Sequence, residues 1–586
     1  MWIVRVNMTD RSYKLEEVPE RYKHLGGRGL TSTLIFDEVD PQCHPLGPNN
    51  KLIFAPGIIT GTTAPTSARL SAGAKSPLTG GIKESNAGTS WAPALAKLQI
   101  KALIIEGMAD KKDGYWMLHL TWQDGKPAVE VLSADGYTGR DLYDVYPEVF
   151  ERFGDNVHVA GIGTAGEFGY PNSGIAYQDM KKRPSRYSGR GGLGAVMGSK
   201  RLKFIVLDPT GTPGVEIADK ALFQQGQKKM REALLEHAVT KPKGGLNTYG
   251  TAILTNILNE AGGLPTRNFR TGRFEGAADI AGEAIFETNK KRMGKEIYNH
   301  ACSPGCIIQC SNTLYDKDGS EIASCVEYES TWALGANCGI GDLDAIGKMV
   351  HLCNAYGLDT IEAGATIGIA MDSGLLEFGD VEGATNLLEE MGKGTPLGRL
   401  MGSGTANVAK AFGNPRSPTV KGQAMPAYEP RAVKGIGVTY ATSPMGADHT
   451  AGYTIATEIL GVGGTSDPLK AEKAKADLSR AFQKSTAVID SSGHCLFIAF
   501  AILDIPSGFE GLIEEINGVL GTQMTADETL EMGAEILRRE RAFNEKAGFT
   551  KADDRLPEFM YTESLPPHNV RAELSGEVLD AVFGEM

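Results

Sequence analysis

Residues 354–359 read Asn-Ala-Tyr-Gly-Leu-Asp, and residues 490–495 read Asp-Ser-Ser-Gly-His-Cys. Both stretches share one pattern: a polar residue, two spacers, a glycine, one further residue, and then Asp or Cys. Either stretch alone is typical of a helix that ends at glycine. As a pair, they indicate that a roughly two-fold symmetric ligand is held between two helix ends.

Four cysteines point to the chemistry beside this ligand. Cys302, Cys306 and Cys310 are evenly spaced, and Cys495 closes the second stretch. Three clustered thiols and one distant thiol favour a [4Fe–4S] cluster, whereas zinc ribbons prefer two close pairs. A structural zinc site or unrelated buried thiols is the alternative. The scattered cysteines are expected to be small buried hydrophobes: Cys43, Cys325, Cys338 and Cys353.

Composition narrows the class of protein. The chain has 586 residues, so two or three domains are expected. A net charge of -13 argues against nucleic acid as a partner. No stretch approaches the length of a membrane span, and residues 1–6 alternate like a strand rather than a signal peptide. We therefore expect a cytoplasmic protein.

The order of periodic segments predicts an α+β fold. Residues 1–208 contain short apolar runs typical of strands, such as 52–54 and 204–207, so a β-rich base domain is expected. Helical periodicity follows in 209–415, where Asp342 can cap a helix that ends at the first stretch. A Gly- and Pro-rich break precedes a second helical domain, 416–586, which carries the second stretch. No other internal repeat is evident.

Two further motifs suggest ligand contacts. A basic run contains glycines at 189, 191 and 192, whose backbone N–H groups can join the cations on a phosphate; its members are Lys181, Lys182, Arg183, Arg186, Arg190, Lys200, Arg201 and Lys203. A solvated basic face is the alternative. Residues 161–166 match G-x-G-x-x-G, but the segment 167–172 does not open a helix, which favours a tight turn over a dinucleotide site.

Many ordered motifs together resemble the tungsten-containing aldehyde:ferredoxin oxidoreductase family, nearly from end to end. The matching segments are Leu25 to Gly29, Pro65 to Arg69, Lys75 to Gly80, Ser85 to Gly88, Gly189 to Gly198, Glu327 to Glu329 and Tyr440 to Pro444. The resemblance implies a β-rich base and two helical domains around a metal. It also implies two pyranopterin dithiolenes on that metal, Mg2+ between their phosphates, and a nearby [4Fe–4S] cluster.

The resemblance also implies which residues form the sites. The cluster ligands would be Cys302, Cys306, Cys310 and Cys495. The pterin and phosphate contacts would be Arg69, Asn86, Gly88, Arg186, Ser188, Arg190, Asn354, Leu358, Asp359, Asp490 and His494. Glu329, with Glu327 as the less favoured neighbour, would be the general base, and His449 would hydrogen-bond the carbonyl oxygen.

The function implied by the resemblance is oxidation of aldehydes to carboxylic acids. Electrons would leave through the cluster to ferredoxin or an iron–sulfur subunit, in a homodimer or hetero-oligomer. Two alternatives stay open: reduction of aromatic acyl-CoA thioesters within a multi-subunit complex, and a zinc-stabilised binding protein without catalysis. Because the pterin sulfurs supply most ligands, the sequence does not separate tungsten from molybdenum.

Three positions depart from the family pattern. The first cysteine spacing carries one extra residue, Asn354 stands where Asp is usual, and His494 replaces the usual Leu beside the fourth cysteine. An amide offers one carbonyl acceptor and an NH2 donor, so Asn354 would bind differently from a carboxylate. The hypothesis for His494 is a relay between pterin and cluster, or a donor that raises the cluster potential.

Overall fold

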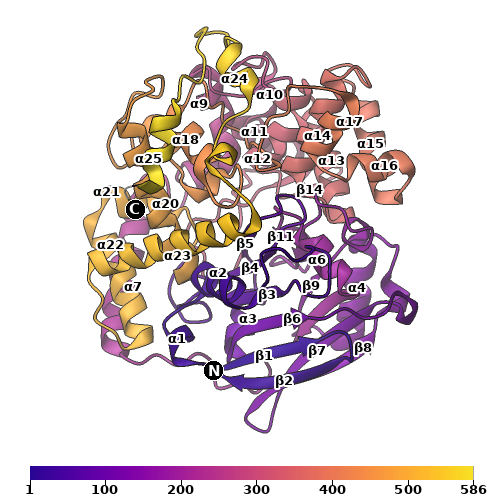
Figure 1. Ribbon diagram of the computed structural model, residues 1–586, viewed down its shortest axis with the longest axis vertical. Helices are drawn as coiled ribbons and strands as arrows, with labels where there is room; N and C mark the ends of the chain where they lie inside the picture. The colour runs from indigo at the N-terminus through magenta and orange to yellow at the C-terminus, as the bar shows by residue number, and fades with distance from the viewer. Residues whose placement is uncertain (585) are drawn as a thin grey trace.

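The computed structural model of the chain describes every residue except 585. Two six-stranded sheets occupy the first part of the chain, and helices make up most of the remainder. In Figure 1 most of these helices lie above the sheets, and α7 and α22 lie at the left beside them. This confirms the α+β expectation. No helix among the described residues has the length and apolar character needed to cross a membrane.

The first sheet has the order β2-β1-β6-β3-β4-β5, and the second has the order β8-β7-β12-β9-β10-β11 when read from its outer end. Their strands are β1 (Trp2–Asn7), β2 (Ser12–Glu17), β3 (Leu52–Pro56), β4 (Arg69–Lys75), β5 (Ile82–Gly88), β6 (Ile100–Glu106), β7 (Trp116–Gln123), β8 (Lys126–Ser133), β9 (His158–Gly161), β10 (Ile175–Tyr177), β11 (Arg186–Ser188) and β12 (Leu202–Leu207). Two short hairpins follow, β13 (Thr313–Tyr315) with β14 (Glu321–Ser324) and β15 (Thr419–Val420) with β16 (Gln423–Ala424).

The two large sheets have the same topology. β1 and β7 each pair antiparallel with the next strand and parallel with the sixth strand of their sheet, β6 and β12. The remaining three strands of each sheet continue as antiparallel neighbours. The base is therefore built twice from one strand order, although the sequence showed no second repeat. The edge strands β5 and β11 contact one another.

The helices are α1 (Glu20–Lys23), α2 (Gly27–Glu38), α3 (Trp91–Lys97), α4 (Leu142–Phe153), α5 (Thr164–Glu167), α6 (Leu193–Ser199), α7 (Lys220–Glu236), α8 (Gly245–Tyr249), α9 (Leu254–Glu260), α10 (Ala277–Ile280), α11 (Gly282–Met293), α12 (Tyr328–Leu334), α13 (Leu343–Tyr356), α14 (Thr360–Asp372), α15 (Val381–Lys393), α16 (Pro396–Met401), α17 (Thr405–Phe412), α18 (Lys434–Thr442), α19 (Ile455–Glu458), α20 (Ala474–Ser492), α21 (Ile498–Asp504), α22 (Pro506–Leu520), α23 (Ala526–Ala547), α24 (Glu558–Thr562) and α25 (Gly576–Gly584). α7 packs along α22, although the two are far apart in the chain.

Both repeated stretches close a helix, as expected. Asp342 caps α13 through its carboxylate, and the helix ends at Gly357 with φ 78°. α20 ends at Gly493 with φ 97°. Glycine suits both positions because side-chain-bearing residues rarely adopt this left-handed conformation.

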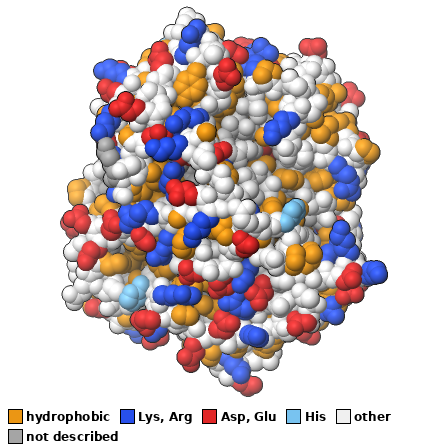
Figure 2. All heavy atoms as spheres, viewed as in Figure 1, with side chains coloured by type: hydrophobic (Ala, Val, Ile, Leu, Met, Phe, Trp, Pro, Cys, Tyr) orange, Lys and Arg blue, Asp and Glu red, His pale blue; other side chains and the backbone are white. Residues whose placement is uncertain are grey.

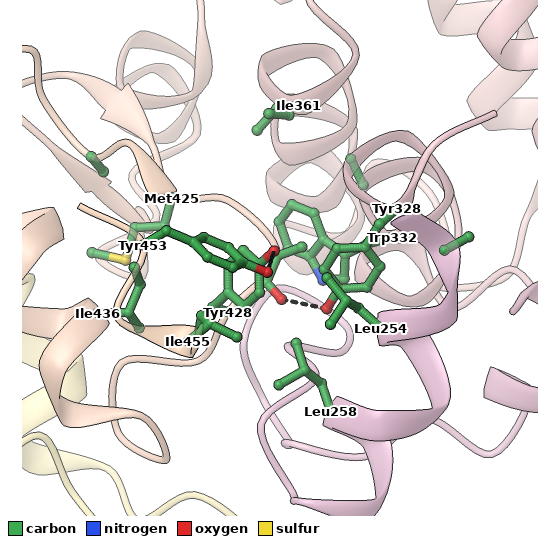
Figure 3. Packing of buried hydrophobic residues seen from close by; sticks show 14 of the residues in the cluster. Leu254, Leu258, Tyr328, Trp332, Ile361, Met425, Tyr428, Ile436, Tyr453 and Ile455 are labelled. Carbon is green, nitrogen blue, oxygen red and sulfur yellow. Dashed lines mark hydrogen bonds between the residues drawn. The ribbon is translucent and has the colours of Figure 1, made fainter. Parts of the chain in front are cut away.

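Aromatic side chains dominate the core of the helical part where it meets the cavity described below. Figure 3 shows Tyr328 and Trp332 of α12 beside Tyr428 and Tyr453. The hydroxyls of Tyr428 and Tyr453 lie 3.0 Å apart, which satisfies two buried polar groups. On the outside, acidic and basic side chains are interspersed over the face seen in Figure 2.

Candidate cofactor and active site

A cavity of about 330 Å³ lies where the base meets the helical part. Its wall includes both repeated stretches, strands β5 and β11, and the start of α12. The predicted residues on its wall are Arg69, Asn86, Arg186, Arg190, Glu329, Asn354, Leu358, Asp359, His449, Asp490 and Cys495. The fold thus brings together side chains that are hundreds of residues apart.

The turn at 490–495 is fixed on the base by backbone contacts. The N–H groups of Ile58 and Ile59 donate to the carbonyls of Ser491 and Ser492, at 3.0 and 2.9 Å. A Cβ on Gly57 would lie 2.1 Å from the Cα of Gly493, so only glycine permits this approach.

The turn at 354–359 is held in the same manner by the second sheet. The N–H of Gly174 donates to the carbonyl of Gly357 at 3.0 Å, and that of Asp359 donates to Asn172 at 2.9 Å. A Cβ on Gly163 would lie 2.2 Å from the carbonyl oxygen of Tyr356. The G-x-G-x-x-G segment therefore packs against this turn. It contains the single helical turn α5, which ends at Glu167, so the residues after it open no helix, as predicted.

Each turn also faces an arginine from a glycine-rich segment. Nη1 of Arg28 lies 3.4 Å from Oδ2 of Asp490, and Nε of Arg190 lies 3.5 Å from Oδ2 of Asp359. Both guanidinium groups are buried, and Glu540 binds Arg28 through both carboxylate oxygens, at 2.9 and 2.8 Å. Two carboxylates, each beside a fixed cation, thus stand on opposite turns.

The four cysteines lie at one end of this site. Nη2 of Arg69 donates to Sγ of Cys495 at 3.4 Å, and a Cβ on Gly88 would lie 3.2 Å from Sγ of Cys302. A hydrogen bond with Cys306 and the charges of Arg186 and Arg69 lower the pKa of the Cys302 thiol to about 5, against the opposing effect of burial. Thiolate character of this kind is what a metal ligand needs.

The other thiols respond to the same charges. Burial raises the pKa of Cys310, and the charges of Glu327, Cys302 and Cys495 raise it further. The ionisation of Cys310 therefore depends on the charge of Cys302 and Cys495. Among the described residues, no three His, Cys, Asp or Glu side chains converge closely enough to hold a single metal ion.

Glu329 and His449 form the polar pair on the cavity wall. Oε1 of Glu329 lies 3.3 Å from Nε2 of His449, and Oε2 accepts the N–H of Ala427 at 3.0 Å. Burial raises the pKa of Glu329 to about 8, and burial lowers the pKa of His449 to about 4. Near neutral pH Glu329 is therefore largely protonated, and His449 is a neutral imidazole with one ring N–H.

Three predicted contact residues lie off the cavity wall. Gly88 adjoins Cys302, as described, and the buried Ser188 donates through Oγ to the carbonyl of Ser85 at 3.1 Å. His494 is fully buried, with Nε2 3.1 Å from Oε2 of Glu515 in α22. Its side chain thus faces α22 rather than the cavity.

The basic run is only partly a ligand site. Of its members, Arg186 and Arg190 reach the cavity. Five others bind protein groups instead: Lys182 pairs with Asp155, Arg183 with Asp179 and Glu321, Lys203 with Glu167, and Lys200 and Arg201 bind carbonyl groups. The candidate anion site of the sequence analysis is therefore reduced to Arg186 and Arg190, which stays a prediction.

The cysteines outside the quartet are buried, except Cys325. Cys43, Cys338 and Cys353 are buried hydrophobes, as predicted. Cys325 is half-buried on the cavity wall and donates to the carbonyl of Ser185 at 2.8 Å, so the simple packing prediction fails for it. The extended run around β14 brings this residue next to Arg186.

Sequence reasoning also missed cavity residues. Arg28 could have been found because the Gly-Arg-Gly pattern of 26–29 recurs at 189–192. Glu84 lies two residues before Asn86 in a strand, hence on the same face. Tyr428 and Tyr453 line the cavity, but no sequence signal marks them.

The cavity wall fits a polar cofactor that is larger than a metal ion. Asp359 Oδ2, Arg190 Nε, Arg69 Nε and Asn86 Nδ2 are buried and have no hydrogen-bond partner within the protein. Buried polar groups are normally satisfied, so these atoms await donors and acceptors from a ligand. Four thiols beside such a wall are typical of a redox protein with an iron–sulfur cluster and a second cofactor.

Comparison with known proteins agrees with this class. Residues 3–209 match the N-terminal domain of aldehyde ferredoxin oxidoreductase, and residues 225–586 match its domains 2 and 3. The tungsten-containing aldehyde ferredoxin oxidoreductase of Pyrococcus abyssi is 37% identical over 96% of this chain and 92% of its own length. That of Thermococcus kodakarensis is 36% identical over 96% and 91%. The chain belongs to the aldehyde ferredoxin oxidoreductase family and is an oxidoreductase.

One more distant relative and one solved structure extend the comparison. The WOR-like subunit of an aliphatic sulfonate oxidoreductase from Pyrococcus furiosus is 25% identical over 97% of this chain and 90% of its own length. The active-site complex BamBC of benzoyl coenzyme A reductase shares the fold, with a TM-score of 0.78 at 18% identity over 99% of this chain and 92% of that chain. This second likeness concerns the fold alone.

Proposed function

We propose that this enzyme oxidises aldehydes to carboxylic acids and passes the electrons singly through a [4Fe–4S] cluster to ferredoxin or an iron–sulfur partner subunit. The Glu329–His449 pair on the cavity wall is the observation that carries this proposal. The identity of more than a third of the residues with tungsten-containing aldehyde ferredoxin oxidoreductases supports it. The proposed location is the cytoplasm.

The cofactors would be held by the residues that face the cavity. A tungsten or molybdenum bis-pyranopterin would bind between the turns of Asp359 and Asp490, with Arg69, Asn86, Arg186 and Arg190 as hydrogen-bond donors and acceptors and Mg2+ on its phosphates. When bound, it would supply a two-electron acceptor. The cluster would be held by Cys302, Cys306, Cys310 and Cys495.

The protein's own part in catalysis is to orient the aldehyde and to move protons. Conversion of an aldehyde and water to a carboxylic acid releases two electrons and two protons. As a carboxylate, Glu329 can accept one of these protons at Oε1. Neutral His449 can donate Nε2–H to the carbonyl oxygen of the aldehyde and stabilise the charge that develops there.

Aromatic side chains lie beside His449 on the cavity wall. The rings of Tyr428 and Tyr453 lie 5.7 and 6.3 Å from the ring of His449. The low polarity strengthens the hydrogen bonds that Glu329 and His449 make.

An activity screen with a dye acceptor tests the proposal. Anaerobically purified enzyme should reduce benzyl viologen with aliphatic or aromatic aldehydes and form the matching carboxylic acid. Aromatic acyl-CoA thioesters serve as the comparison set, offered with reduced dye. Turnover of a thioester without any aldehyde oxidation would contradict the proposal and favour the reductase alternative.

A further inference from the structure

Strand β5 runs along the wall of the cavity and presents alternate residues to it. Glu84, Asn86 and Gly88 share one face because strand side chains alternate. Gly88 lies against Cys302 at the cluster end, and Asn86 accepts a hydrogen bond from Arg69 Nη1 at 2.8 Å. Glu84 stands four residues from Gly88, about 13 Å along the strand. Neither the cluster nor the catalytic pair uses it.

Glu84 is left without a hydrogen-bond partner for one oxygen. The residue is 7% exposed, it lines the cavity, and its Oε1 has no partner in the protein. The neighbouring cations are engaged elsewhere: Arg28 is bound by Glu540 in two-point fashion, and Nζ of Lys83 lies 3.3 Å from Asp448. Burial raises the pKa of Glu84 to about 8, and the charge of Asp490 acts in the same direction.

A buried carboxyl oxygen without a hydrogen-bond donor costs free energy, and a donor that reaches this oxygen removes the cost. Because Glu84 borders the cavity, a ligand held there can supply that donor. Asp490 faces the same end of the cavity beside Arg28, so two carboxyl groups converge on one ligand position. At the other turn, Arg190 similarly lies between Asp359 and Asp448, at 3.5 and 4.0 Å.

We propose that Glu84 is a cofactor-binding residue, which together with Asp490 accepts hydrogen bonds from the aminopyrimidine edge of the pterin that rests on the turn at 490–495. This edge carries neighbouring N–H donors, and a carboxylate can accept two of them at once. Such donors favour the ionised form, so Glu84 would become a carboxylate when the pterin binds. Arg28 keeps Asp490 paired while Glu84 supplies the additional acceptor. The inference rests on the proposed function, because it assumes that a pterin occupies the cavity.

The test compares holoenzymes of the wild type, Glu84→Gln and Glu84→Asp. Tungsten or molybdenum per chain is measured by elemental analysis, and pterin by the fluorescence of its oxidised form after denaturation. Loss of a charge-assisted acceptor should make Glu84→Gln release pterin about ten-fold faster than the wild type during gel filtration. Glu84→Asp keeps the charge and should restore part of the retention.

A matched control separates binding from folding. Glu458 is also a buried carboxylate, paired with Lys475 Nζ at 2.6 Å and off the cavity wall. Glu458→Gln should lower the melting temperature of the cofactor-free protein and keep wild-type pterin retention. The inference would be overturned if Glu84→Gln released pterin at the wild-type rate. It would also be overturned if Glu84→Gln and Glu458→Gln had equal melting temperatures and Glu84→Gln lost no more pterin than Glu458→Gln. A wild type that binds no pterin would instead overturn the proposed function.

Discussion

Half-buried Glu329 and buried Asp448 lie beside the same histidine, and their surroundings move their pKa values in opposite directions. Burial dominates at Glu329, where the N–H of Ala427 and the charge of Arg190 offset it only in part. Burial also tends to raise the pKa of Asp448, but the positive charges of Lys83 and Arg190 hold this pKa well below its usual range. One carboxyl group is therefore able to exchange a proton near neutral pH, whereas the other is a fixed charge.

The pH dependence of aldehyde oxidation follows from this difference. Because Glu329 acts as a base only when deprotonated, its raised pKa means that the rate rises with pH and levels off above about pH 8. Glu329→Gln should lose about a hundred-fold or more in kcat while metal content stays unchanged. The measurement is the kcat profile from pH 6 to 10 at saturating aldehyde. A flat profile in the wild type would contradict the assignment of Glu329 as the base.

The cysteine assignment predicts different results for neighbouring thiols. Cys306→Ser should lower iron content and the broad absorbance near 400 nm, because a serine hydroxyl is a poor substitute for a thiolate ligand. Cys325→Ser is the matched control, since a hydroxyl can also donate to the carbonyl of Ser185. Iron is measured per chain after anaerobic purification. Equal iron loss in both variants would count against the assignment of the quartet.

At the scale of elements, the close approach of the base to the helix ends positions the cavity. Gly57 follows β3 and touches Gly493, so Gly57→Ala would force two backbones apart. We expect Gly57→Ala to destabilise the protein by about 1–3 kcal/mol and to reduce cofactor retention. Thermal unfolding with and without cofactor measures both effects. Gly136→Ala is the control, because a Cβ there meets nothing within 4 Å; equal melting temperatures for both variants would contradict this account.

The junction of α20 with α22 gives a separate prediction. His494 and Glu515 are both fully buried, so His494→Leu leaves a buried carboxyl group without its partner. The expected cost is about 3–5 kcal/mol of unfolding free energy, measured by denaturant titration. The double variant His494→Leu with Glu515→Leu should recover most of the unfolding free energy that the single variant loses. If the single variant keeps wild-type stability but shifts the cluster potential, the earlier hypothesis of a donor to the cluster explains His494 better.

At the scale of the whole molecule, the sequence predicted what local pattern and motif encode. Helix ends at Gly357 and Gly493, the capping by Asp342 and the strand-rich base were all predictable, because each depends on residues that are neighbours in the chain. The shared topology of the two sheets was not predictable. Equivalent strands pair in the same order in both sheets, but no repeat is visible in the sequence.

The candidate site, like the fold, could be predicted from the sequence only in part. The resemblance predicted Asp359, Asp490, Glu329 and His449 as site residues, and all four line the cavity. Sequence could not show that His494 faces Glu515 or that most of the basic run binds other parts of the protein. These outcomes depend on contacts between distant segments, which no local pattern reports. The direction of a side chain in a strand, by contrast, follows from alternation, and Glu84 could have been found in this way.

The central claim is that this chain carries a pterin-bound metal and an iron–sulfur cluster. Elemental analysis of anaerobically purified protein for W, Mo, Fe, Mg and Zn tests it most directly. The account predicts about one W or Mo and about four Fe per chain, as one [4Fe–4S] cluster requires. Zinc alone, with neither tungsten nor molybdenum, would contradict it.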